Sequence, residues 1–392
     1  MLAEFKRSIK QSIYMPKLVW KKGELDAFKT ASTAVNNFTT PIFVIPPAGS
    51  FDHEKQRILT PAEHIRLFGP KLQEARQSRP VFVDAIYLDD ARHRAAFNEH
   101  PLTALLERAR LGRAQAWPVT SYGRSDDYQQ AVAKAHLTHG SPVAIQLRLA
   151  DLGAASLAVR LQSLCNQISC DPNEVTLVID CGPLFLPDEG KEEEFASGLI
   201  LALNLLPKLY DWGQIALVAT SLGGLEKIKP QEERLIRRSE WHIYKRLLQR
   251  RNELYRMPIF SDYGVEYREN LAPIKAMPST KFNYTTNEAY FFIKGENVKT
   301  GGYQAIFPVA EKLVKSLHFM GASFSAGDAR IWLLSERRGT SGNAPTWKWA
   351  CADHHLTVVG AALCDALGMR IDETFKTISA QQADLFSVVP AE

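Results

Sequence analysis

Charged residues directly follow apolar runs at several points of this 392-residue chain. Asp180 comes immediately after VTLVI, and Asp262 closes the run that begins at Pro258. A carboxylate beside such a run is costly to bury unless it is paired or used in function. We therefore expect Asp180 and Asp262 to be catalytic, each as a general base or as a ligand of a divalent cation that bridges to phosphate.

Basic and small residues near other runs suggest an anionic ligand. Lys21 and Glu24 follow the first run and are further catalytic candidates, and Arg148 ends the fifth run and offers a bidentate fork to an anion. Helix capping is the alternative explanation for an acid or a serine in such a position. The remaining candidates are all predicted to bind the ligand: Asp84, Tyr122, Ser221, Gly223, Gly224, Tyr263, Trp347 and His354.

The turn Ser221-Leu222-Gly223-Gly224 follows the seventh run. Barrel proteins often bind phosphate with the loop after the seventh strand, where small residues let backbone N–H groups approach the anion. The position favours a phosphate site that Lys21 and Arg148 would complete. An ordinary tight turn is the alternative for these four residues.

Apolar runs and segments with helical spacing alternate over the first two thirds of the chain, which is typical of βα units. Eight strands are predicted at 14–20, 41–47, 80–88, 116–120, 142–149, 175–180, 214–220 and 258–262. Helices are predicted at 23–34, 61–77, 100–111, 126–139, 154–169, 191–209 and 231–255. This order predicts a TIM-like (β/α)8 barrel with a C-terminal α+β extension. An open doubly wound sheet is the alternative, although no GxGxxG follows an early strand.

The alternation ends after Asp262. Two strands, or one long strand, are expected over 281–294, then a helix at 303–319, irregular Gly-rich sequence at 321–347 and a helix near 350–368. We predict a barrel over 1–270, an extension over 271–380 that packs on or closes the barrel, and a flexible tail over 381–392. In another register the barrel would begin at Pro41 and use 288–294 as its eighth strand. The loop 339–346 could also cover the barrel mouth as a lid and bring Trp347 and His354 to the ligand.

Composition excludes several classes of protein. With 45% apolar and 23% charged residues, the chain is neither disordered nor a collagen or disulfide scaffold. No apolar run reaches the roughly 18 residues of a membrane span, so we expect a cytoplasmic protein without membrane contact. The five cysteines show no zinc-site spacing, and no metal site is predicted from them.

The segment 231–255 is rich in Lys and Arg, with Trp241 and Tyr244 interleaved. This composition is typical of a solvated outer helix with i, i+4 ion pairs. Phosphate contacts to nucleic acid, or docking of an acidic protein partner, are the alternatives.

A series of motifs resembles the Beta protein family. They include YMPKLVWKKGELDAF, TPIFVIPP, RPVFVDAIYLD, PVAIQLRLADL, FSDYGVEY, FNYTTNEAYFFIKG and GTSGNAPTWKWACADHHLTVV, in order from about residue 14 to about residue 368. The first motif of the family usually has Lys where this chain has Val19, whereas Lys21, Gly23 and Glu24 agree. The resemblance implies a bacteriophage, mobile-element or defence-associated setting and no particular reaction.

Two functions remain open from the sequence. The first is an enzyme that binds a phosphorylated or nucleotide small molecule at the C-terminal face of the barrel and has hydrolytic or lyase activity. A divalent cation is the cofactor that this function would allow. The second is a non-catalytic module of a phage or anti-phage system that engages a protein partner encoded nearby, or nucleic acid, through the segment 231–255.

Overall fold

Eight parallel strands form a barrel in a computed structural model that describes residues 12–49, 51–52, 57–271 and 277–369. Around the barrel the strands follow the order of the chain: β1 (Lys17–Val19), β2 (Ile42–Val44), β5 (Val81–Asp84), β6 (Ala116–Thr120), β7 (Val143–Arg148), β8 (Val175–Pro183), β9 (Gln214–Thr220) and β11 (Ile259–Ser261). The last strand is joined to the first by hydrogen bonds from Met15 N to Phe260 O (3.0 Å) and from Lys17 N to Asp262 O (2.7 Å). The predicted (β/α)8 barrel is confirmed, and the register that begins at Pro41 is wrong because β1 pairs with β2.

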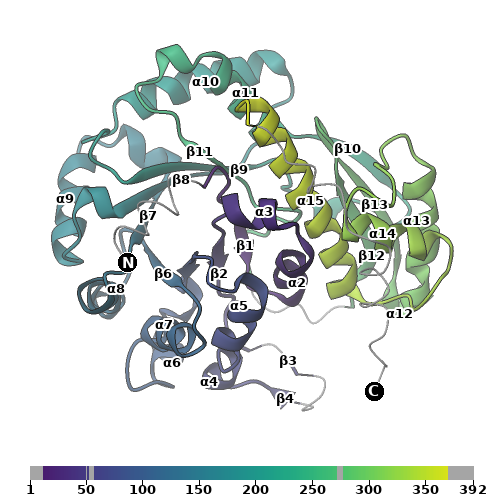
Figure 1. Cartoon of the computed structure of the whole chain (residues 1–392), viewed down its shortest axis with the longest axis horizontal. Coiled ribbons are helices and arrows are strands. Elements are labelled where there is room, and N and C mark those ends of the chain that lie inside the picture. The colour runs from purple at the N-terminus through teal and green to yellow at the C-terminus, as the bar shows by residue number, and fades with distance from the viewer. Residues whose placement is uncertain (1–11, 50, 53–56, 272–276, 370–392) are drawn as a thin grey trace.

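Helices cover the outside of the barrel, as Figure 1 shows. Those that follow the first seven barrel strands are α2 (Lys22–Thr30) with α3 (Thr33–Phe38), α4 (Pro61–His64) with α5 (Phe68–Arg76), α6 (Ala91–Arg94) with α7 (Pro101–Leu111), α8 (Asp126–His139), α9 (Leu157–Gln167), α10 (Glu189–Asn204) and α11 (Ser239–Gln249). Local sequence sets several of these boundaries. Thr60 and Glu63 form a capping box at α4, Ser125 caps α8, and Gly140 ends α8 in the left-handed region (φ 58°).

A second sheet lies beside the barrel and has three antiparallel strands in the order β10 (Glu233–Arg237), β13 (Ala289–Asn297) and β12 (Ser279–Thr285). The predicted helix 231–255 is therefore wrong over its first part, because ERLIR pairs along β13 before α11 begins. A short hairpin, β3 (Phe51–Asp52) and β4 (Arg57–Ile58), forms a third sheet near α4.

The extension has more helix than the sequence suggests. It contains α12 (Val298–Gly301), α13 (Ile306–Lys315), α14 (Ala326–Ser335) and α15 (Ala344–Ala366). The prediction of irregular structure over 321–347 is wrong at 326–335 and 344–347, because Ser325 caps α14 through the backbone N–H of Asp328 and Asn343 caps α15 through Thr346. The flexible tail predicted over 381–392 lies outside the described residues.

The helix α15 packs along α2 on the flank of the barrel, with Trp349 Nε1 donating to Thr30 Oγ1 at 3.0 Å. It thus occupies the place of the eighth barrel helix, the one that would follow β11 in a simple (β/α)8 chain. The strands and helices between 277 and 343 are inserted between β11 and this helix. Among the described residues, none of the helices combines the length and apolar composition that crossing a bilayer requires.

Two apolar cores follow from the alternation of side chains along each strand. The outer faces of the strands pack against the helices in the larger core. The inner faces fill the lumen with a smaller cluster: Met15, Ile42, Phe82, Trp117, Val119, Ala144, Val178, Ala216 and Val218. Residues two positions further along these strands therefore point into the lumen at its C-terminal mouth.

Candidate functional site at the barrel mouth

A lysine, a carboxylate and a phenol are joined by hydrogen bonds in the lumen at the mouth. Lys17 Nζ donates to Asp180 Oδ2 at 2.7 Å, and Tyr263 OH donates to Asp180 Oδ1 at 2.6 Å. Gln146 accepts from Lys17 (2.9 Å) and donates to Asp180 (3.2 Å), and Gly182 N donates to Asp180 Oδ1 (2.9 Å). The Lys17 and Asp180 side chains are 10% and 9% exposed, so the cluster is largely shielded but reachable from solvent.

Strand geometry places these side chains. Lys17 lies two residues after Met15 and Asp180 two residues after Val178, and both Met15 and Val178 belong to the lumen cluster. Tyr263 packs against the same cluster. The period of two along each strand thus brings residues from the first, sixth and eighth barrel strands to one point.

Lys17 was missed from the sequence. The lysine predicted instead, Lys21, comes after β1 has ended and is the N-cap of α2. Lys17 interrupts the run YMPKLV at the position where the inner face demands an apolar residue, and that interruption was the available signal. Val19 lies two residues further along the same strand, so Lys17 and Val19 share one face of β1.

The environment changes the proton affinity of the cluster. Burial works to raise the pKa of Asp180, but the Lys17 ammonium and the hydrogen bonds from Lys17 and Tyr263 bring it below its ordinary value. Burial and the Asp180 charge hold the pKa of Tyr263 well above its ordinary value. Asp180 is therefore ionised and Tyr263 protonated at neutral pH.

Other predicted ligand-binding residues surround this cluster. Arg148 is exposed at the end of β7, in register with Asp180 on β8. Asp84, at the end of β5, is buried and accepts two hydrogen bonds from Arg124 (3.0 and 3.2 Å). Four predicted residues thus lie at the strand ends: Asp180, Tyr263, Arg148 and Asp84. The charge of Asp84 is already paired with that of Arg124.

Two further tyrosines are half-buried near the mouth. Tyr267 packs edge-on against Tyr263 with ring centroids 4.9 Å apart. Tyr122, a predicted ligand residue, has the Arg160 guanidinium 4.2 Å above its ring, and burial raises its pKa to about 12. Tyr267 thus adds an aromatic ring beside the charged cluster, whereas Tyr122 packs against the outer core under Arg160 of α9.

Asp262 lies on the opposite face of its strand. Its carboxylate is fully buried and accepts from Tyr14 OH (2.6 Å), Gly264 N (3.0 Å) and His355 Nε2 (3.0 Å). Thr285 Oγ1 lies 2.8 Å from the other nitrogen of His355. Because residues alternate along the strand, Tyr263 enters the lumen while Asp262 joins the barrel to the extension. The two predicted catalytic carboxylates therefore lie apart, Asp180 in the lumen and Asp262 between the barrel and the extension.

The turn after β9 does not present its hydroxyl to a ligand. Ser221 Oγ donates to Glu240 Oε2 at 2.6 Å and accepts from Ser239 N at 2.9 Å. Glu240 is buried and also accepts from Tyr290 OH at 2.8 Å. Gly223 lies against the Phe185 ring, and Gly224 makes the turn with φ 78°. The Glu240 carboxylate beside Ser221 would repel a phosphate group, which argues against the predicted phosphate site.

Lys21 and Glu24 do not reach Asp180 in this structure. Lys21 is exposed at the start of α2. Glu24 is buried and pairs with Lys348 of α15 at 3.0 Å, and Lys348 also pairs with Glu266 at 2.9 Å. These ion pairs connect α2, α15 and the loop after β11, so Glu24 has a structural partner rather than an open site.

The predicted lid residues are buried in the extension. Trp347 Nε1 donates to Ser341 O at 2.8 Å. His354 lies 2.8 Å from Asp328 Oδ2 and 2.7 Å from Thr285 O, and its ring stacks on Tyr284 with centroids 3.8 Å apart. The lid hypothesis is wrong for these two residues, because α15 runs along the flank of the barrel and both side chains are buried in the extension.

The basic segment 231–255 is engaged within the protein. Arg237 pairs with Glu192 (2.7 Å), and Arg246 and Arg250 pair with Glu193 (2.8 and 2.7 Å). These contacts attach β10 and α11 to α10. These three arginines, which the alternative interpretation gave to a nucleic acid or an acidic partner, are therefore paired with carboxylates of the neighbouring helix.

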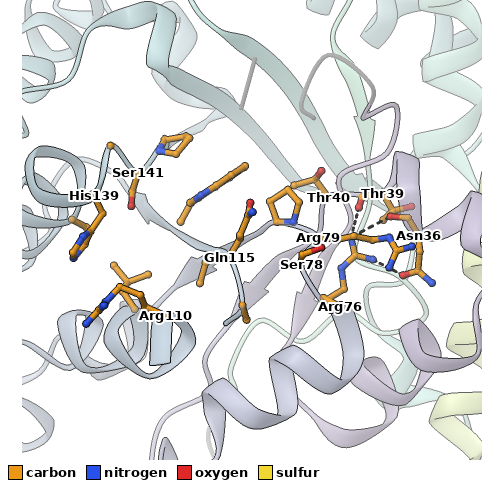
Figure 2. Close-up of a pocket in the computed structure, with 18 of the residues that line it drawn as sticks. Asn36, Thr39, Thr40, Arg76, Ser78, Arg79, Arg110, Gln115, His139 and Ser141 are labelled. Carbon is orange, nitrogen blue, oxygen red and sulfur yellow. Dashed lines mark hydrogen bonds between the residues drawn. The ribbon is translucent and has the colours of Figure 1, made fainter. Parts of the chain in front are cut away.

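A cavity of about 740 Å³ lies at the opposite, N-terminal end of the barrel. Figure 2 shows Arg76, Arg79 and Asn36 on one side of it and Arg110, His139 and Ser141 on the other. Arg76 is fully buried and donates to Asn36 Oδ1 (2.6 Å) and Thr39 O (2.6 Å), and burial lowers its pKa to about 9. No candidate from the sequence lies here.

The fold and the mouth define the chain as a (β/α)8-barrel protein with an acid–base cluster at the carboxyl ends of its strands. The family model described as "Beta protein" matches residues 14–361, and the chain belongs to the Beta protein family. A search of curated protein sequences found no significant match.

Three solved structures show similarity at low sequence identity. A trimodular GH5_4 endoglucanase has a TM-score of 0.39 at 9% identity, over 66% of this chain and 57% of that chain. The YdjI aldolase from Escherichia coli K12 has a TM-score of 0.32 at 8% identity, over 67% and 80%. A 2,3-dimethylmalate lyase of the PEP mutase/isocitrate lyase superfamily has a TM-score of 0.34 at 10% identity, over 67% and 79%.

Proposed function

We propose that the protein is an enzyme that binds an anionic small molecule at the barrel mouth and cleaves it by acid–base chemistry, as a hydrolase or a lyase. The observation that carries the proposal is the hydrogen-bonded cluster of Lys17, Asp180 and Tyr263 at the carboxyl ends of three strands. This end of a (β/α)8 barrel is where such proteins carry out their chemistry.

Each group has a distinct role in the proposal. Lys17 and the exposed Arg148 supply positive charge for a phosphate or carboxylate group, Arg148 through a two-pronged contact. Asp180 is ionised and accepts a proton once the substrate anion has drawn Lys17 away from it. Tyr263 keeps its proton at neutral pH and donates it to the leaving group or to a developing oxyanion.

The donor set around Asp180 does not suit a divalent cation. Its two oxygens accept from Lys17, Tyr263, Gln146 and Gly182, all of them hydrogen-bond donors. The nearby Asp84 carboxylate is paired with Arg124. We therefore assign the proton transfers to side chains.

The bacteriophage or anti-phage setting is an implication of the family resemblance.

The test begins with ligand binding. The wild-type protein is screened by thermal shift against phosphorylated metabolites, nucleotides and di- and tricarboxylates, and hits are measured by calorimetry. Lys17→Met and Arg148→Ala should each weaken binding tenfold or more, since each removes a charge-assisted contact worth about 1.5–3 kcal/mol. Asp127→Asn, an exposed carboxylate on α8 paired with Arg94, is the control and should bind as the wild type does.

Turnover is then measured with the ligands that bind. Asp180→Asn and Tyr263→Phe should retain the fold and lose product formation, detected by mass spectrometry, by about 10²-fold or more. Retention of full turnover by Asp180→Asn, or of full affinity by the Lys17→Met/Arg148→Ala double variant, would refute the proposal.

A further inference from the structure

Three potential metal ligands meet on the outer wall of the barrel, away from the mouth. His136 lies in the last turn of α8, Cys170 follows α9, and Glu174 directly precedes β8. One ligand atom from each lies within 4.8 Å of the other two. The side chain of Cys170 is buried and those of His136 and Glu174 are 10% and 17% exposed, so the cluster is shielded on one side and open on the other.

Backbone contacts hold the three side chains in place. Cys170 N donates to Cys165 O (3.0 Å), which ends the helix α9. Glu174 Oε2 accepts from Asp171 N (3.2 Å) in a capping box just before β8 begins at Val175. The cluster is therefore built on the last turn of α8 and on the short segment that joins α9 to β8, not on a long loop.

The hydrogen bonds of His136 leave two acceptor atoms facing each other. Its Nδ1 lies 2.9 Å from the carbonyl oxygen of Ser141, which can only accept, so Nδ1 carries a proton. In the neutral imidazole Nε2 then presents a lone pair, and it faces Glu174 Oε2 at 3.3 Å. Two acceptors at this distance require either a second proton on the ring or a cation between them.

The third group favours the cation. Cys170 Sγ lies beside these two acceptors, and its only hydrogen bond found in the described part of the chain is a long one to Asp171 O at 3.8 Å. A second proton on His136 would give Glu174 a hydrogen-bond donor, but it would add no partner for the Cys170 sulfur. A metal ion satisfies all three, and a histidine fixed by a carbonyl at its other nitrogen is the usual arrangement in metal sites.

We propose that His136, Cys170 and Glu174 bind one Zn²⁺ ion. Imidazole, thiolate and carboxylate together suit this borderline-soft ion, and three protein ligands leave the fourth tetrahedral position to water. On binding, the Cys170 S–H bond breaks, the Zn–S bond forms and the proton leaves to solvent, while His136 stays neutral. Ser141, which orients His136, lines the cavity at the N-terminal end of the barrel (Figure 2).

The site escaped prediction because its spacing follows no motif. His136 lies on α8 and Cys170 in the segment after α9, and Cys170-Asp171-Pro172-Asn173-Glu174 contains a single cysteine. Only the adjacency of α8, α9 and β8 around the barrel brings the three ligands together.

The experiment measures metal in the full-length, untagged protein. After incubation with Zn²⁺ and exhaustive dialysis, elemental analysis should find about one equivalent per chain, and Zn²⁺ should raise the melting temperature. With Co²⁺ in place of Zn²⁺, a near-ultraviolet thiolate-to-cobalt band should appear and report the sulfur ligand directly.

Variants identify the ligands. Cys170→Ser should lose the cobalt band and most of the bound zinc, whereas Cys364→Ser, a buried thiol in α15, should keep both. Glu174→Gln changes a partly exposed side chain and should weaken zinc binding tenfold or more while the protein remains folded by circular dichroism. No retained zinc in the wild type, or equal retention in Cys170→Ser or Glu174→Gln, would overturn the proposal in favour of a protonated His136–Glu174 ion pair.

Discussion

Replacing Asp262 by alanine should destabilise the protein and leave ligand binding at the mouth intact. The carboxylate is fully buried on the outer face of β11 and joins the barrel to α15 through His355. Burial works to raise the pKa of Asp262, but His355 and the hydrogen bonds from His355, Tyr14 and Gly264 lower it. The ionised carboxylate is thus the acceptor around which three buried donors are arranged.

The magnitude follows from what each substitution leaves behind. Alanine removes the acceptor from Tyr14 OH, Gly264 N and His355 Nε2 together, and breaking a buried charged pair in this way costs about 3–5 kcal/mol. Asparagine keeps an amide oxygen for Tyr14 and Gly264 and loses the charge-assisted bond to His355, which costs about 1.5–3 kcal/mol. Stability should therefore fall in the order wild type, Asp262→Asn, Asp262→Ala.

Guanidinium unfolding measures these differences as shifts of the midpoint at constant slope. Asp180→Ala is the comparison, because Asp180 follows an apolar run in the same way but faces the lumen, and it should abolish product formation. An Asp262→Ala protein within about 1 kcal/mol of the wild type would refute the structural role, since the lost charge-assisted contact and the unpaired Gly264 N–H together cost more than that even if Tyr14 OH pairs with His355 Nε2, 3.1 Å away. Loss of ligand affinity in a stable Asp262→Ala protein would refute its placement outside the site.

Two further predictions concern charge and packing. The pKa of Asp180 is depressed in the folded protein, so its contribution to stability is present above the unfolded-state pKa of about 3.9 and is lost as pH falls through the lower folded-state pKa. The stability difference between wild type and Asp180→Asn, followed by urea unfolding from pH 7 to pH 3, should accordingly shrink below about pH 4; a difference that grows there would contradict the assigned direction. Gly69→Ala should lower the free energy of unfolding by about 1–3 kcal/mol, because its Cβ would overlap the carbonyl oxygen of Arg108 where α5 meets α7. Gly198→Ala, in open space on α10, is the control. Equal effects of the two substitutions on the unfolding midpoint would contradict the close approach.

The sequence allowed the barrel to be predicted because each barrel strand is a short apolar run between polar segments. VTLVI in β8 and IALVA in β9 are buried on both faces, which only parallel strands beneath helices require. Seven of the eight predicted runs contain a whole barrel strand, and the eighth, 175–180, covers the first six residues of β8. The failure over 231–255 has an equally local cause: ERLIR is charged and partly exposed, and its strand conformation depends on pairing with β13, more than fifty residues away.

The candidate site could be predicted only in part, because a run buried on both faces does not reveal which face a residue occupies. Asp180 and Asp262 carry the same signal in the sequence, a carboxylate at the end of an apolar run. Closure of the barrel fixes their faces: Asp180 shares the inner face with Val178, whereas Asp262 lies one residue before the inward Tyr263. A shift of one residue along a strand exchanges lumen and outer wall.

This alternation also explains why the extension can be large without covering the mouth. Directly after β11, Tyr263 enters the lumen and Asp262 contacts His355 of α15, so alternate residues serve the candidate site and the attachment of the extension separately. The chain then leaves the barrel, builds the three-stranded sheet and α14, and returns as α15 along α2. Because the returning helix fills the position of the eighth barrel helix, the insertion adds to the flank, and the cluster of Lys17, Asp180 and Tyr263 keeps its contact with solvent.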